Sequence, residues 1–234
     1  GLWKNCITKS IAGVRLICWY KLVKDRGSGC GEKTDGIFKQ EDGKYSIPDN
    51  LRQCDPGLAD VMMNIACSDN RGIEALEEAN LIPDAIYYNK PITVYERAKW
   101  HEAALLELRD VDVVFVDPNN GLLVKSVGKK SLRSVKYTFY EEVSDYINQR
   151  KSVLIYNHRC RKSEDQCFQD ICENLSKHTG IPEDRILKIT FPKCSVRDYL
   201  AVSFSTNHAK KIERAFLEME QGIRGKLGVC RIPK

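Results

Sequence analysis

The sequence predicts one three-layer α/β domain around a mostly parallel sheet, with an antiparallel strand near the C-terminal end of the chain. Short apolar runs typical of buried strands alternate with helical segments, the pattern of parallel βαβ units. The chain has 234 residues, 42% of them hydrophobic, which suits one domain with a sizeable core. The last two long strand segments are too close for a parallel crossover, which needs about a dozen residues or more, so they should pair antiparallel.

The first half of the chain contains five predicted elements before the first fully apolar strand. Residues 14–23 are rich in β-branched and aromatic side chains and predict a strand. A helix should begin after Asp55, a capping residue followed by proline in the first turn. The predicted elements of this half are strands at 14–23 and 85–89 and helices at 56–67, 72–80 and 94–109.

The second half repeats apolar strands and amphipathic helices more regularly. The run at 112–116 is apolar after its first residue and ends at an Asp-Pro pair, and the run at 152–156 is also apolar. Both lengths suit strands covered on both faces. The predicted elements are strands at 112–116, 152–156, 186–191, 199–204 and 229–232, and helices at 140–149, 163–178 and 207–221.

Composition limits the classes of protein. We expect residues 1–234 to form a single domain, with a glycine-rich polar loop at 24–44 and a basic loop at 125–136. No apolar run is long enough to span a membrane, so we expect no membrane association. The ten cysteines include no CxxC pair, and Cys18, Cys67 and Cys172 lie in apolar runs. We therefore expect a reduced, cytoplasmic protein, with a disulfide framework as the alternative.

Polar residues follow several predicted strands at the point where each strand ends. In open α/β sheets, ligands bind outside the carboxyl ends of the strands, so these residues form the candidate site. They are Asp25 and the loop 27–31 after the first strand, Asn89 after the second, residues 117–121 after the third, and Asn157, His158 and Arg159 after the fourth.

Asp117 is the strongest candidate for chemistry because a carboxylate at the tip of a buried strand is an exposed acceptor on a fixed backbone. Pro118 restricts Asp117 to an extended conformation. A simple strand-to-loop turn is the alternative, since Asp, Pro, Asn and Gly all favour turns. His158, a lone histidine at the next strand tip, has either a catalytic or a structural role.

The segment 115–122, FVDPNNGL, resembles the "FxDPDNGL" segment of a group of uncharacterised bacterial proteins of similar length. Further matching segments are Cys18-Trp19-Tyr20, Lys136-Tyr137 with Glu141, and Tyr156-Asn157-His158. More remotely, the layout is similar to class I AdoMet-dependent methyltransferases of the ribosomal-RNA adenine-N6 type. The resemblance implies a Rossmann-like methyltransferase-type sandwich.

In those methyltransferases, an Asp-Pro-Pro-Tyr strand tip holds the amine of a base that has left its helix. The resemblance places Asp117 and Pro118 at the first two positions, as acceptors for that amine. Asn119 and Asn120 replace the second proline and the stacking aromatic. We include both asparagines and His158 in the expected catalytic set.

AdoMet is the expected cofactor, because such enzymes place a glycine-rich turn after the first strand. Asp25, Gly27, Gly29, Gly31 and Asn89 are the expected cofactor-binding residues. A lone GxGxG pattern also fits a surface loop, which stays the alternative.

Two basic segments follow the candidate strand tips and predict nucleic-acid contacts. Segment 125–136 contains five basic residues and no acid, and segment 159–162 contains Arg159, Arg161 and Lys162. Lys and Arg contacts to phosphates add salt-dependent affinity. The expected substrate-binding residues are Asn157, Lys125, Lys129, Lys130 and Arg159. A solvated basic loop is the alternative.

The sequence thus predicts an AdoMet-dependent methyltransferase-like protein acting on nucleic acid. Two alternatives stay open: a degenerate nucleotide- or partner-binding module, and a Mg²⁺-dependent nuclease using clustered carboxylates such as Asp110, Asp112 and Asp117. The spacing of His158 with Cys160, Cys167 and Cys172 matches no closed zinc pattern, so no metal site is predicted.

Overall fold

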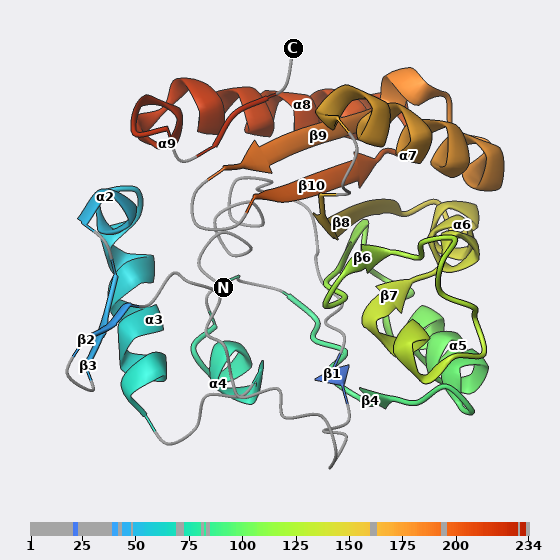
Figure 1. The fold of residues 1–234 in the computed structure, drawn as a ribbon, viewed down its shortest axis with the longest axis horizontal. Helices are drawn as coiled ribbons and strands as arrows, with labels where there is room; N and C mark the ends of the chain where they lie inside the picture. Colours follow the sequence, from blue (N-terminus) through green and yellow to red (C-terminus); the bar gives the residue numbers. More distant parts are fainter. Residues whose placement is uncertain are drawn as a thin grey trace.

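The computed structural model is a mixed α/β fold built around a four-stranded sheet (Figure 1). It describes residues 21–22, 39–41, 44–47, 49–68, 73–80, 82, 85–159, 163–192, 196–228 and 230–232. The sheet contains β5 (Val113–Val116), β8 (Ser152–His158), β10 (Arg197–Val202) and β9 (Ile186–Phe191), in that spatial order.

The predicted mostly parallel sheet is wrong in its pairing. Within the four-stranded sheet, only β5 and β8 pair parallel, whereas β10 pairs antiparallel with both β8 and β9. The short connection after β9 forces the chain to turn back, as the sequence predicts. However, β10 enters between β8 and β9, so β5, β8 and β9 run in one direction and β10 alone runs against them.

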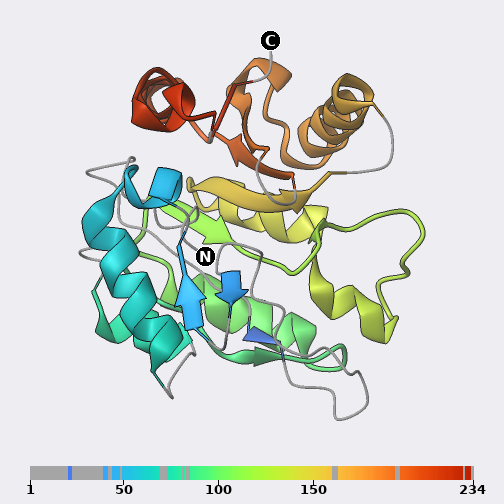
Figure 2. The same ribbon diagram turned by 60° about the vertical axis from the view of Figure 1, so that its left-hand side comes forward.

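Helices cover both faces of this sheet, which is why its strands are almost continuously apolar. On one face, side chains from β5, β8, β9 and β10 pack with α3 (Pro56–Cys67) and α8 (Thr206–Gln221). On the other, they pack with α5 (Arg97–Glu107), α6 (Tyr140–Asn148) and α7 (Glu164–Thr179). Figure 2, turned by 60°, shows the helices on the two sides of the sheet. These are called the α3/α8 face and the α7 face below.

The main predicted helices are confirmed, and capping side chains account for several of their starts. The Asp55 carboxylate accepts a hydrogen bond from Leu58 N at 3.0 Å, so α3 begins at Pro56. Ser163 and Ser205 cap α7 and α8 in the same way. Gly180, at φ +69°, ends α7 in the left-handed conformation that glycine tolerates.

The remaining elements are short. They are β1 (Lys21–Leu22), β2 (Lys39–Glu41), β3 (Lys44–Ser46), α2 (Asp49–Arg52), α4 (Ile73–Glu78), β4 (Pro91–Ile92), β6 (Gly121–Leu122), the 3₁₀ helix η1 (Leu132–Lys136), β7 (Tyr137–Thr138), the 3₁₀ helix η2 (Glu183–Arg185) and α9 (Ile223–Lys226). The hairpin of β2 and β3 lies partly within the segment 24–44, which the sequence predicts as loop.

Two predicted strands are wrong. Residues 85–89 form no strand; instead, Tyr88 donates its hydroxyl to Trp100 O at 2.9 Å and packs edge-on against the Trp100 ring. The strand that does form nearby is β4, which pairs with β1. The predicted strand at 229–232 is reduced to a single bridge between Arg231 and Thr190.

Two further expectations concern cysteine chemistry and the membrane. Cys172 is a buried free thiol, as predicted, but Cys67 is exposed and Cys167 is disulfide-bonded, so the fully reduced reading is wrong at Cys167. Within the described ranges, the helices are all too short or too polar to cross a membrane.

Candidate functional site

The candidate site lies at the carboxyl end of β5, beside the last residues of β8, which continues three residues past its pairing with β5. Side chains alternate between the two faces of a strand, and Phe115 packs on the α3/α8 face, so Asp117 directly after β5 belongs to the same face. In β8, Tyr156 and His158 also point to this face, whereas Asn157 points to the α7 face. The structure therefore brings Asp117 and His158 to one face at these strand ends and turns Asn157 to the other face, whereas the sequence analysis groups all three together.

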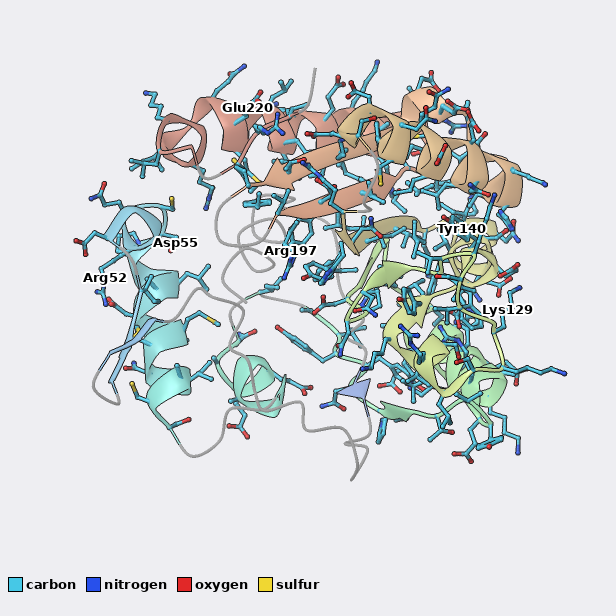
Figure 3. All side chains as sticks on the ribbon, viewed as in Figure 1. Arg52, Asp55, Lys129, Tyr140, Arg197 and Glu220 are labelled. Carbon is cyan, nitrogen blue, oxygen red and sulfur yellow. The ribbon has the colours of Figure 1, made fainter. Side chains whose placement is uncertain are left out.

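The α3/α8 face of this edge carries groups that can donate and accept protons. The Tyr156 hydroxyl and His158 Nε2 share a hydrogen bond at 3.0 Å. Arg197, opposite His158 in the β8–β10 register, places its guanidinium 5.8 Å from the Tyr156 ring centroid. Figure 3 shows Arg197, the first residue of β10, extending toward the middle of the molecule. Asp117 is 8% exposed and Pro118 is also buried, so the carboxylate lies in a largely desolvated position.

Tyr156 and Arg197 are site residues that the sequence does not single out. Tyr156 could have been found, because a strand period of two puts it on the same face as His158. Arg197 could not, because its position depends on β10 entering beside β8. Together with Asp117, these side chains bring an acid, an imidazole, a phenol and a guanidinium to one sheet edge.

Asn157, a predicted substrate-binding residue, makes structural hydrogen bonds at this site. Its Oδ1 accepts a hydrogen bond from Leu122 N at 3.0 Å, and its Nδ2 donates to His158 O at 3.0 Å. Its neighbour Gly121 has φ +101°, and an added Cβ there would clash with Asn157 Oδ1. The bond from Leu122 N thus fixes the chain after Asp117 against β8, and the bond to His158 O holds the Asn157 side chain in place.

Asn119 and Asn120 differ in their surroundings. The Asn120 backbone N–H donates to Lys136 O at 2.9 Å, and its carbonyl accepts from His158 N at 3.4 Å. Its side chain is half-buried, whereas Asn119 is exposed. Asn119 is therefore the asparagine that is open to a substrate.

Arg159, a predicted substrate-binding residue, forms ion pairs with two carboxylates of the protein. Its guanidinium contacts Asp198 Oδ1 at 3.0 Å and Glu164 Oε2 at 3.1 Å. Burial lowers the pKa of Arg159, but the hydrogen bond and charge of Asp198, reinforced by Glu164, outweigh it and raise the pKa overall. The rest of the predicted second basic cluster, 160–162, lies outside the described residues.

The basic segment 125–136 forms the connection between β6 and β7. These two short strands pair with each other, so both ends of the segment are held beside the residues that follow Asp117. Lys125, Lys130 and Arg133 are exposed and form no ion pair within the described part of the chain. Lys129, on the surface in Figure 3, pairs with Glu141 at 2.7 Å, so part of its charge is neutralised.

Arg97 anchors this segment from inside. It forms a buried two-pronged ion pair with Glu142, at 2.6 and 2.7 Å, and stacks 3.6 Å from the Phe139 ring centroid. It also donates to the carbonyls of Ser134 and Tyr137, at the end of the basic segment. The cationic surface is therefore pre-formed, which lowers the entropy cost of binding an anion.

Four of the five predicted cofactor residues, Asp25, Gly27, Gly29 and Gly31, lie outside the described residues. The fifth, Asn89, makes a long contact from Nδ2 to Glu77 Oε2 at 3.5 Å. Within the described ranges, no group of three or more His, Cys, Asp or Glu residues is arranged to hold a metal ion.

Comparison with models of protein families finds no match to this chain. Searches among curated proteins and among solved structures likewise find no similar protein. Function is therefore inferred from the residues and geometry of this chain.

Proposed function

We propose that the protein is an AdoMet-dependent methyltransferase-like enzyme that acts on nucleic acid. The strand order carries the proposal: a last, reversed strand, β10, enters between β8 and β9, while Asp117-Pro118 stands at the carboxyl end of β5. One reversed strand near the end of an otherwise co-directional sheet is the pattern of class I methyltransferases. In that pattern, the acid-proline tip presents the group to be methylated.

The residues at the carboxyl ends of β5 and β8 suit methyl transfer. The Asp117 carboxylate and the Pro118 carbonyl are acceptors that would orient the N–H or O–H of a substrate, so that its lone pair points away from the protein. Bound AdoMet supplies the activated methyl group. His158, held by the Tyr156 hydroxyl at 3.0 Å, is the residue best placed to take up the proton that the substrate loses.

The basic segment supports a nucleic-acid substrate. Lys125, Lys130 and Arg133 form an exposed cationic surface that begins a few residues after Asp117 and is tied back to it by β6 and β7. Removing one cation that binds a phosphate should reduce the slope of log affinity against log salt by about 1. A triple replacement of these residues by glutamine should therefore weaken binding of a nucleic acid and flatten its salt dependence.

The test combines cofactor binding with methyl transfer. AdoMet or its product at ~100 times Kd should stabilise the protein by about 2.7 kcal/mol, seen as a rise in Tm. Radiolabelled methyl groups from AdoMet should appear in RNA or DNA. D117N should reduce incorporation at least ~100-fold, the loss expected for a group acting in the transition state. D112N changes an exposed acid at the other end of β5 and should leave incorporation unchanged.

Other outcomes would reject the proposal in distinct ways. Nucleic-acid binding without any response to AdoMet would indicate a binding module. A Tm shift with Mg²⁺ alone, together with strand cleavage, would indicate a nuclease. Equal incorporation by D117N and the unaltered protein would remove Asp117 from the mechanism.

A further inference from the structure

The β9 strand forms one edge of the central sheet, and part of its backbone has no partner strand among the described residues. The Thr190 N–H and C=O both bond outward, to Arg231. Residues of an antiparallel strand alternate between inward- and outward-directed hydrogen-bonding groups, so Lys188, two residues earlier, directs its N–H and C=O to the same outer side. Neither group has a backbone partner among the described residues. Such an edge can accept a further strand.

A cavity of about 280 Å³ lies at this open edge. Ile186, Leu187 and Lys188 all line it. Side chains of consecutive strand residues point to opposite faces, so three in a row can line one cavity only if it lies along the strand edge. Phe168 of α7 and Leu217 of α8 line it from the two sides. The two helices thus form apolar walls above and below the open backbone.

The exposed charged residues that line this cavity are acidic. Asp165 of α7 and Glu213 of α8 both line it, and both are exposed. Lys188 also lines it, but its side chain is only 4% exposed and lies 3.4 Å from Glu164. An added strand would alternate its side chains between the two helices, and on either side it would meet an apolar wall and a carboxylate.

The described part of the C-terminal segment ends at Ile232 and pairs with only the neighbouring part of the edge. Arg231 forms a bridge with Thr190, and Ile232 lines the cavity beside the open backbone. Among the described residues, the backbone of this segment forms no hydrogen bond with Lys188.

We propose that β9 binds an extended, basic peptide as an additional strand over Ile186–Lys188, with apolar side chains in the cavity and cationic side chains at Asp165 and Glu213. Main-chain hydrogen bonds supply affinity in this mode, and pockets for alternating side chains supply specificity. A second copy of the chain is a poorer occupant, because pairing two β9 edges would bring the same acids together. This peptide site is independent of the proposed methyltransferase activity.

The test uses a fluorescein-labelled hexapeptide of alternating lysine and valine, measured by fluorescence anisotropy in 50 mM salt. The chain has a net charge of +5, so general electrostatics oppose binding of a cationic peptide and a positive result is informative. The same peptide with glutamate for lysine should bind at least tenfold more weakly. Methylating the peptide nitrogens on alternate residues removes N–H donors without changing charge and should weaken binding at least fivefold.

Matched variants locate the site on the protein. D165K/E213K should weaken binding of the lysine peptide at least tenfold. E173K/E218K makes the same charge change on the same two helices, outside the residues that line the cavity, and should change affinity less than twofold. Equal weakening by both variants, undiminished binding of the N-methylated peptide, or a dimer in sedimentation that D165K/E213K strengthens would overturn the proposal.

Discussion

Gly121 occupies a position that only glycine tolerates, three residues after Pro118 of the acid-proline tip. It has φ +101°, and a Cβ there would clash with Asn157 Oδ1 and lie 2.9 Å from Asn157 Cα. G121A should therefore lower the free energy of unfolding by about 2–4 kcal/mol, combining backbone strain with displacement of Asn157. Urea denaturation measures this loss.

Gly128 in the basic segment is the control for this substitution. No atom lies within 4 Å of a Cβ added at Gly128, and its φ is not positive. G128A should change stability by less than about 0.5 kcal/mol. Equal losses for both variants would show that the contact between Gly121 and Asn157 does not constrain the fold.

The free thiols of Cys172 and Cys67 should differ in reactivity, because Cys172 is buried and Cys67 is exposed. Burial raises the pKa of the Cys172 thiol to about 12, and nearby Glu183 contributes to the rise. Cys67 is exposed at the end of α3. The thiolate is the nucleophile, so a thiol reagent at pH 8 should modify Cys67 in the folded protein and leave Cys172 unmodified until urea is added. Mass spectrometry after digestion locates the label, and early labelling of Cys172 would contradict its burial.

At the scale of elements, the ion pair of Arg97 and Glu142 joins α5 to α6 and to the end of the basic segment. Both side chains are 7% exposed. R97M would leave the Glu142 carboxylate buried without a cation and should cost about 3–5 kcal/mol in urea denaturation. R97M/E142M removes both charges, so it should be more stable than R97M. A double variant that is less stable than the single one would contradict this.

The helices could be predicted from the sequence because the residues that start and end a helix lie within it or next to it. Asp55 and Pro56 determine where α3 starts, and its predicted and observed ranges coincide. The predicted strand at 85–89 fails because β-propensity depends on a partner, and Tyr88 packs on α5 through Trp100 instead. The same dependence reduces 229–232 to one bridge, at Arg231.

At the scale of the whole molecule, strand order decides which predicted site residues meet. The positions of Asp117 and His158 at one edge could be predicted, because each follows an apolar strand. The structural roles of Asn157 and Arg159 could not, because they depend on Leu122 and Asp198, which no local pattern brings close. The turn after β9 can be predicted because it depends only on neighbouring residues. The insertion of β10 beside β8 cannot, because it pairs residues that are far apart in the sequence.

The network around Glu164 predicts how the whole molecule responds to acid. Glu164 begins α7 and contacts Arg159 after β8, Lys188 of β9 and Arg231 of the C-terminal segment. Partial burial raises its pKa, but the charges of Lys188, Arg159 and Arg231 outweigh burial and lower the pKa overall. A carboxyl with a lowered folded pKa stabilises the protein above its unfolded value, about 4.3, and loses that contribution as pH falls through the folded value.

E164Q tests this linkage because it removes the charge and keeps the shape. At pH 7, it should be less stable than the unaltered protein, and the difference should shrink as pH falls from about 5 toward 3. E102Q, an exposed change on α5, is the control and should match the unaltered protein throughout. Urea denaturation at each pH gives the two curves. If the difference in unfolding free energy between E164Q and the unaltered protein stays constant with pH, Glu164 acts through its shape. If that difference grows in acid, the folded pKa of Glu164 is not lowered.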